Sequence, residues 1–292
     1  MSMDVRITQK GFFKNYLTIN AIIGSELCYG KSDPYLRLVP NERDGDEFSV
    51  YLPNYPGRGI YVKFDEKNLK NIDLKLLFPS LTEEVRAFFN LIRRLSQLWK
   101  CSIEIDGNII DPKNLDAKEK DTIAFNTNVF DMLCKEILDG KMQKLTMPCV
   151  CFPIEAGKEE AEKFLGRNDL FQKWILDLQL PDYYYGAPVL RESNKTVVGV
   201  FVVTFDTETI LPLVPSIPDG ATNTDTGEPV ECKKYHVNFY NYRRSSMLPD
   251  DIEYNKFLGL IPSEKKARFD EGHILIKLSE DDIKQIIADS KK

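Results

Sequence analysis

The sequence predicts an α+β fold, in which antiparallel sheet carries helices on one face. Segments with alternating apolar and polar residues lie between residues 47 and 76, and a segment with helical periodicity follows from Ser80 to Trp99. Alternation with a period of two is typical of a half-buried strand, whereas apolar residues three and four positions apart are typical of an amphipathic helix. Because several strands separated by turn residues precede the helix, an antiparallel sheet is expected.

The N-terminal segment, residues 1–46, predicts a mixture of loops and strands. Residues 19–23 are apolar enough to begin a helix, but glycine and proline interrupt their surroundings repeatedly. From Glu47 onward the pattern is clearer, and three strands are expected at residues 48–52, 59–64 and 72–76. Turn residues separate these segments, so we expect an antiparallel meander.

A long amphipathic helix is expected after this meander. Ser80 stands three residues before Glu83, which is the arrangement of a capping box at a helix start. A strand over residues 103–105 is expected next, and Asp106-Gly107 after it is typical of a hairpin turn. The apolar residues of the helix recur at helical spacing: Val85, Phe88, Phe89, Ile92, Leu95 and Trp99.

The middle of the chain predicts helices around one short strand. A helix is expected from Asn128 to Leu138, with Gly140 as its terminator. Residues 144–153 are interpreted as an apolar strand with Pro148 at a bulge or sheet edge. Short helices are expected near residues 158–165 and 169–178. We therefore expect two closely associated halves, residues 1–140 and 141–292.

The C-terminal part of the chain predicts further strands and one last helix. Residues 215–229 are rich in Pro, Gly, Thr, Asn and Asp, which predicts an exposed loop. Ser279 precedes Asp282 by three residues, which predicts the capped start of the final helix. Strands are expected at residues 183–185, 189–190, 197–205, 235–240 and 274–278, with a turn at 192–195.

Composition limits the class of protein. Hydrophobic residues make up 42% of the 292 residues, which is enough for a sizeable core. The formal net charge of -6 opposes binding to nucleic acid or to anionic lipid. No apolar segment approaches the roughly 18 residues that a membrane helix needs, and residues 1–6 lack the features of a signal peptide. The six dispersed cysteines predict reduced thiols, so a cytoplasmic location is expected.

The segment Gly57-Arg58-Gly59-Ile60-Tyr61-Val62-Lys63-Phe64-Asp65-Glu66, together with the strand ending Phe78-Pro79-Ser80 and the long helix, resembles an uncharacterised family. Its members are cytosolic bacterial proteins of about the same length as this chain, and the similarity covers residues 57–111. The family carries only a domain-of-unknown-function label. The resemblance therefore implies a fold unit and a bacterial origin, with no activity attached.

Cys149 and Cys151 are the first candidates for chemistry. Their spacing suits a soft metal ion, but a structural zinc site needs about four ligands and no second pair completes one. Thiol catalysis needs a nearby base, and the histidines of the chain are His236 and His273. No metal and no cofactor are expected, and two small buried thiols are the favoured interpretation.

Glycine-rich, tyrosine-rich and basic segments are candidates for binding. Arg58 between two glycines could hold a phosphate, although turn chemistry before a strand is the favoured interpretation. Tyr183, Tyr184 and Tyr185 could form a ligand or partner surface, with at least one ring on the opposite strand face. Aromatic and basic residues also alternate in a run that would suit single-stranded nucleic acid: Tyr240, Tyr242, Arg243 and Arg244.

The sequence establishes no function. The favoured hypothesis is a non-catalytic cytosolic protein that binds another protein or a small ligand. The alternative is a thiol-dependent hydrolase or transferase that uses Cys149 or Cys151 with His236. Nucleic-acid binding is a weaker hypothesis, a membrane partner is not expected, and the sequence specifies no oligomeric state.

Overall fold

The computed structural model describes residues 1–11, 17–64, 70–193, 196–218, 220–222 and 228–292 and confirms the α+β class. The chain forms two compact units, unit 1 from Met1 to Pro181 and unit 2 from Asp182 to Lys292. Gly140, where the sequence suggested a boundary, lies inside unit 1. The helices that follow Gly140 pack against the helix that precedes it, so the chain continues the same core there.

Unit 1 is built on an eight-stranded sheet with the order β3-β2-β4-β5-β6-β1-β7-β8, in which all neighbours are antiparallel. The expected meander is confirmed as β4, β5 and β6. The turn between β7 and β8 is also confirmed, since Asp106 and Gly107 both have positive φ. The strands are β1 (Ser2–Gln9), β2 (Cys28–Ser32), β3 (Leu38–Pro40), β4 (Glu47–Leu52), β5 (Tyr55–Lys63), β6 (Asn71–Leu77), β7 (Cys101–Ile105) and β8 (Asn108–Ile110).

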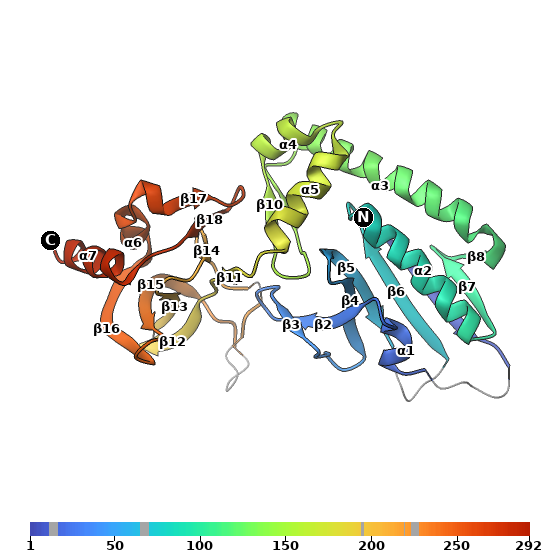
Figure 1. The fold of residues 1–292 in the computed structure, drawn as a ribbon, viewed down its shortest axis with the longest axis horizontal. Coiled ribbons are helices and arrows are strands. Elements are labelled where there is room, and N and C mark those ends of the chain that lie inside the picture. Colours follow the sequence, from blue (N-terminus) through green and yellow to red (C-terminus); the bar gives the residue numbers. More distant parts are fainter. Residues whose placement is uncertain (12–16, 65–69, 194–195, 219, 223–227) are drawn as a thin grey trace. The chain divides into compact units, whose positions relative to one another are not determined.

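One face of this sheet is buried and the other is polar. Along β1 the apolar side chains of Met3, Val5 and Ile7 are buried, while Asp4 and Arg6 on the opposite face are exposed. Helix α2 (Thr82–Leu98) lies against the buried face, where it contacts β1, β4, β5 and β7 (Figure 1). Alternation in the strands and helical periodicity in α2 therefore meet in one core.

The start of α2 differs from the expected one. The helix begins after Leu81, and Glu84 rather than Glu83 reaches back to accept a hydrogen bond from the Leu81 backbone N–H at 3.1 Å. Ser80 instead donates its hydroxyl to the Leu77 carbonyl, and Glu83 pairs with Arg86 on the surface. The cap is displaced by one residue because the Glu84 side chain is buried, where it accepts a hydrogen bond from Gly59 of β5.

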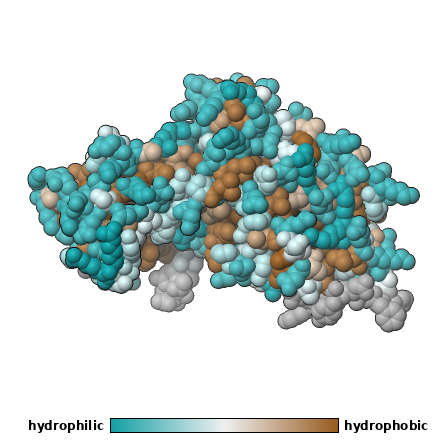
Figure 2. Space-filling model, viewed as in Figure 1, coloured by the Kyte–Doolittle hydropathy of each residue, from teal (hydrophilic) through white to brown (hydrophobic). Residues whose placement is uncertain are grey.

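The remaining helices of unit 1 are α1 (Ile19–Ile23), η1 (Pro112–Asn114), α3 (Leu115–Leu138), α4 (Lys158–Phe164) and α5 (Asn168–Gln179). α3 is much longer than the expected helix at 128–138. The N-terminal half of α3 buries few side chains, and two of them, Thr122 and Asn126, are polar. This half therefore lacks the apolar periodicity that predicts a helix from sequence. The outer surface of α4 is largely hydrophilic (Figure 2).

The expected strand at residues 144–153 is mostly a loop. β9 (Leu145–Met147) pairs with β10 (Ile154–Ala156), and residues 148–153 run between them outside any strand. Pro148 and Pro153 have no backbone N–H to give to a sheet ladder. The loop instead makes hydrogen bonds to other parts of unit 1, described below.

Unit 2 contains two four-stranded sheets, ordered β11-β14-β18-β17 and β12-β13-β15-β16. Most neighbours are antiparallel, but β13 pairs with β15 in parallel, and so does β11 with β14. The strands are β11 (Tyr184–Tyr185), β12 (Val189–Ser193), β13 (Thr196–Thr204), β14 (Thr209–Pro212), β15 (Cys232–Asn241), β16 (Ser246–Glu253), β17 (Lys266–Arg268) and β18 (His273–Ile276).

The helices of unit 2 are α6 (Tyr254–Leu260), η2 (Ser263–Lys265) and α7 (Glu280–Ser290). The predicted cap of α7 is confirmed, because the Ser279 hydroxyl accepts from the Asp282 N–H and Asp282 accepts from the Ser279 N–H. Part of the turn expected at 192–195, residues 194–195, lies outside the described residues. The described residues of 215–229 form no helix or strand, apart from one bridge between Thr222 and Pro229.

Candidate functional site

The Gly57-Arg58-Gly59 segment lies in β5 of unit 1, where a central sheet strand meets the start of α2. Gly59 has φ of +72°, a backbone conformation that residues with a Cβ rarely adopt. A Cβ at Gly57 would lie 2.8 Å from Leu81 Cγ and closer still to the Glu84 carboxyl group. The backbone conformation therefore favours glycine at residue 59, and the close approach of α2 favours glycine at residue 57. The turn-chemistry interpretation assigns the glycines a backbone role of this kind.

Glu84 of α2 holds the backbone of this segment through hydrogen bonds. Its carboxylate is 2% exposed and accepts hydrogen bonds from the backbone N–H groups of Gly59 at 2.6 Å, Leu81 at 3.1 Å and Arg58. Burial raises the pKa of the Glu84 carboxyl, while the three N–H groups and the positive charge of Arg58 oppose the rise. One buried side chain thus joins the start of α2 to the β5 glycines.

The Arg58 side chain is held by main-chain oxygens. Nε donates to the Pro148 carbonyl at 3.2 Å and Nη1 donates to the Phe78 carbonyl at 3.0 Å. Burial lowers the pKa of the Arg58 guanidinium, and the nearby Cys149 and Glu84 groups oppose that effect. The group remains a cation, because an arginine is not deprotonated in proteins. No described residue accepts a hydrogen bond from Nη2.

The loop at residues 148–152 closes over this segment. The Val150 N–H donates to the Gly57 carbonyl at 2.7 Å, and the Leu38 N–H donates to the Cys151 carbonyl at 3.0 Å. Gln179, a buried side chain of α5, accepts from the Cys151 N–H at 3.0 Å and donates to the Phe152 carbonyl at 3.0 Å. These bonds place the loop beside Arg58 in one defined conformation.

A pocket of about 140 Å³ lies between this loop and the sheet, and we call it the Arg58 pocket. Its charged lining residues are Arg58 and Lys31, and the side chain of Lys31 pairs with Glu42 at 2.9 Å. No lining residue is His, Asp or Glu. The pocket is lined by Lys31, Ser32, Leu38, Ser49, Arg58, Gly59, Tyr61, Leu77, Pro148, Cys149 and Val150.

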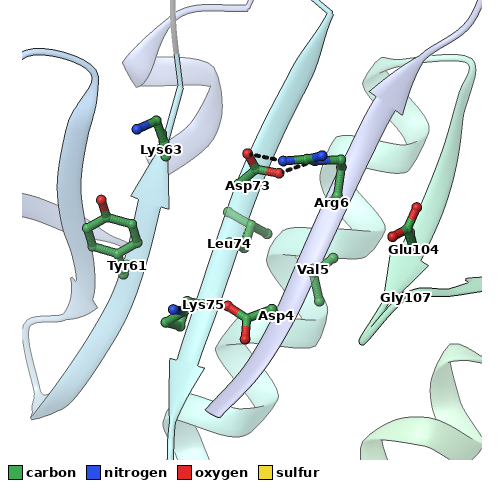
Figure 3. A pocket seen from close by; sticks show the side chains of 10 residues that line it. All are labelled: Asp4, Val5, Arg6, Tyr61, Lys63, Asp73, Leu74, Lys75, Glu104 and Gly107. Carbon is green, nitrogen blue, oxygen red and sulfur yellow. Dashed lines mark hydrogen bonds and ion pairs between the residues drawn. The ribbon is translucent and has the colours of Figure 1, made fainter.

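A second, larger hollow of about 330 Å³ lies on the polar face of the same sheet (Figure 3). Four of its charged residues form pairs: Arg6 donates to both oxygens of Asp73, at 2.6 and 3.0 Å, and Lys75 lies 3.2 Å from Asp4. Cross-strand pairs of this kind are usual on the solvated side of an antiparallel sheet. Lys63, a further lining residue, pairs with Glu47 at 2.7 Å, so each cation that lines the hollow already has a carboxylate partner. The Arg58 pocket is therefore the stronger candidate.

The proposed catalytic residues belong to different units. Cys149 is 4% exposed and lines the Arg58 pocket of unit 1, and the Cys151 thiol contacts the Gln179 carbonyl at 3.4 Å. His236 lies on β15 of unit 2, where Nδ1 is 2.8 Å from Asp251. Within the part of the chain that the structure describes, no group of three or more His, Cys, Asp or Glu residues could hold a metal ion.

His273 has a different environment from His236. Its Nδ1 lies 2.8 Å from the buried Asp270 carboxylate, and its Nε2 lies 3.0 Å from the Tyr185 hydroxyl. The imidazole is 5% exposed. This chain of three polar groups ties β11 to β18 across β14, so it satisfies buried polar atoms within the sheet.

The tyrosine and arginine candidates lie in unit 2 and divide between core and surface. The ring of Tyr183 packs edge-on against Phe269. The next residue, Tyr184, is 40% exposed. Tyr242 is 48% exposed, with the Arg243 guanidinium over its ring. Arg243 also pairs with Asp206 at 3.0 Å, Arg244 is exposed, and Tyr240 on β15 is half-buried. The aromatic and basic run therefore ends in a hairpin turn before β16.

Sequence reasoning missed Glu84, Asn126 and Gln179. Asn126 is 1% exposed and bonds both the N–H and the carbonyl of Ser80, each at 2.8 Å. Each of these three polar side chains is buried in a helix and bonds backbone that is distant in sequence. A polar residue at a helical position that the apolar pattern would assign to the core is the signal that could have found them.

The described residues include no helix long and apolar enough to cross a membrane. A family model described as Domain of unknown function (DUF4299) matches residues 2–286. The chain belongs to this family. DUF4299 therefore includes both units, and residues 57–111, on which the resemblance was based, lie within the matched range. No curated protein and no solved structure matches the chain.

Proposed function

We propose that this DUF4299 protein is a non-catalytic protein that binds a small ligand in the Arg58 pocket. The observation that carries the proposal is the guanidinium of Arg58, which two main-chain carbonyls hold beside the pocket while Nη2 donates to no described residue. Ligand pockets typically combine apolar walls with a few fixed polar groups that orient the ligand. Arg58 among Leu38, Leu77 and Pro148 has this character.

The site is preformed, which favours binding. Glu84 fixes the backbone of Arg58 and Gly59, and Gln179 fixes the loop that carries Cys149. A pocket whose walls are already ordered loses little conformational entropy when a ligand enters it.

The residues that line the pocket favour binding over catalysis. A general acid or base must lie within hydrogen-bond reach of the reacting atoms, and His, Asp and Glu most often serve in this role. None of these residue types lines the Arg58 pocket. The volume of about 140 Å³ is also below the roughly 300–1,000 Å³ of drug-sized sites, so the ligand is small or inserts one end.

A substitution that fills the pocket tests this function. Ser49 on β4 lines the pocket, and Ser49→Leu would place an apolar side chain there. We expect small molecules that bind the wild-type protein in ligand-observed NMR to lose binding in Ser49→Leu and to keep it in Ser102→Leu. Ser102 is the matched control, since it lies on β7 of the same sheet and does not line the pocket. Binding that survives Ser49→Leu would place the ligand elsewhere.

A thiol-dependent hydrolase or transferase is the second candidate, because Cys149 lines the same pocket as Arg58. A nearby cation favours the thiolate, which is the reactive form. If this candidate is right, iodoacetamide should label native Cys149 faster than the buried Cys134, and Arg58→Gln should slow that labelling. Labelling of Cys149 no faster than of Cys134 would reject it.

We also propose that unit 2 binds another protein and that the protein is located in the cytoplasm. Tyr184 and Tyr242 present exposed rings, and tyrosine is common in protein interfaces. All six cysteines are free thiols, the state that a reducing compartment maintains. Loss of a pulled-down partner on Tyr242→Ser, but not on Tyr55→Ser in unit 1, would support a surface at this hairpin.

A further inference from the structure

We infer that the ligand of the Arg58 pocket is a small organic acid whose carboxylate accepts hydrogen bonds from the Arg58 guanidinium. The inference rests on the proposed function, and it adds the chemical class of the ligand. The hydrogen bonds of Arg58, the charges that line the pocket and its apolar lining residues support it.

The hydrogen bonds of Arg58 leave donors for a ligand. A guanidinium carries five N–H groups in a planar fork. The carbonyls of Pro148 and Phe78 take one from Nε and one from Nη1, and they also fix the plane of the fork. No residue that the structure describes accepts a hydrogen bond from the remaining N–H groups, on Nη1 and Nη2. Carboxylate oxygens match this fork in spacing and charge.

The charges around the pocket favour an acid over a neutral ligand. Both charged lining residues, Arg58 and Lys31, are basic, although the whole chain has a net charge of -6. Lys31 already pairs with Glu42, so Arg58 is the cation that is left for a ligand. Glu84 is a carboxylate that interacts electrostatically with Arg58, and its oxygens accept hydrogen bonds from backbone N–H groups. Glu84 therefore balances the charge of Arg58 without occupying its side-chain N–H groups.

The rest of the lining sets the size and polarity of the acid. The side chains of Leu38 and Leu77 supply apolar surface, and Ser32 and Ser49 supply hydroxyl groups. A water molecule occupies about 30 Å³ in the liquid. The pocket of about 140 Å³ therefore suits an acid of roughly five or six non-hydrogen atoms, or the acidic end of a larger one.

A pair of molecules of equal size, one with a carboxylate and the other with a neutral amide, tests the inference on the intact wild-type chain. Butyrate and butyramide have the same size, and NMR titration of the ¹⁵N-labelled protein reports their binding at the Arg58 Nε–H and at the Ser49 amide. We expect butyrate to shift both signals saturably and butyramide to bind at least about tenfold more weakly. Inorganic phosphate, an acid without an apolar part, should also bind more weakly than butyrate.

Two variants assign the effect to Arg58. Arg58→Gln should weaken butyrate at least about tenfold, whereas Arg86→Gln should leave it unchanged, because Arg86 lies on the outer face of α2 and pairs with Glu83. Equal binding of butyrate and butyramide would reject an acid while the ligand pocket stands. Phosphate binding that equals or exceeds that of butyrate would reject an organic acid. Absence of butyrate binding while the Ser49→Leu test succeeds would reject the acid, and failure of the Ser49→Leu test rejects the pocket itself.

Discussion

Replacement of Glu84 by Gln tests the central contact of unit 1. The carboxylate has two oxygens for the N–H groups of Arg58, Gly59 and Leu81, whereas an amide has one oxygen and a donor in place of the other. At least one buried N–H group then loses its acceptor, at a cost of about 1–3 kcal/mol. Arg58 also loses its nearby opposite charge, while removal of a buried charge offsets part of the loss. We expect Glu84→Gln to lower the free energy of unfolding by about 2–4 kcal/mol.

The unfolding of unit 1 can be followed by itself. Both tryptophans, Trp99 and Trp174, lie in unit 1, so tryptophan fluorescence during urea denaturation reports this unit. Glu83→Gln is the matched control, since Glu83 is the preceding residue and forms a surface pair with Arg86. We expect the control to change stability little. A Glu84→Gln protein as stable as the control would refute the role that we assign to the carboxylate.

The pH dependence tests the balance between burial of Glu84 and the groups that oppose its effect, the three N–H groups and Arg58. Because burial raises the pKa of Glu84 in the folded protein above its ordinary value of 4.5, the folded state holds the proton more tightly than the unfolded state. The contribution of Glu84 to stability is therefore fully present below that ordinary pKa and is lost as pH rises through the folded-state pKa. The stability difference between wild type and Glu84→Gln should be larger at about pH 4 than at about pH 7. A difference that grows toward pH 7 would show that the hydrogen bonds and Arg58 outweigh burial.

Three further substitutions test single contacts. Asn126→Ala removes both bonds to the Ser80 backbone and should lower the fluorescence-detected unfolding free energy by about 2–4 kcal/mol; a loss below about 0.5 kcal/mol would contradict this. Gly59→Ala and Gly45→Ala both place a Cβ at positive φ, at a cost of about 1–2 kcal/mol each, but only the first meets a side chain, at 3.1 Å. Gly59→Ala should therefore lower the unfolding free energy more than Gly45→Ala in the same assay. Equal decreases for the two variants would show that the loop containing Val150 moves aside at no cost. Ser279→Ala removes the cap of α7 and should lower the opening free energy of its amides in hydrogen exchange by about 1 kcal/mol; unchanged exchange would show that the hydroxyl contributes nothing.

The sequence by itself determined those elements whose signals lie within a few residues. Ser279 and Asp282 form the cap of α7 because both partners belong to one helical turn. Asp106 and Gly107 form the β7–β8 turn because both tolerate positive φ. Period-two alternation likewise predicted β4, β5 and β6. The sequence also marked Arg58 and Cys149 separately, on local grounds.

Only the tertiary structure decided what these residues do together. Arg58 and Cys149 share a pocket because the loop after β9 bonds to β5, as in the hydrogen bond from Val150 to Gly57. The choice of Glu84 over Glu83 as the cap of α2 has the same origin, since the Gly59 N–H that it satisfies lies 25 residues away. The parallel pairing of β13 with β15 also joins distant segments. Such contacts follow from the burial of polar groups in a shared core, where each must find a partner, and no short stretch of sequence records which partner that is.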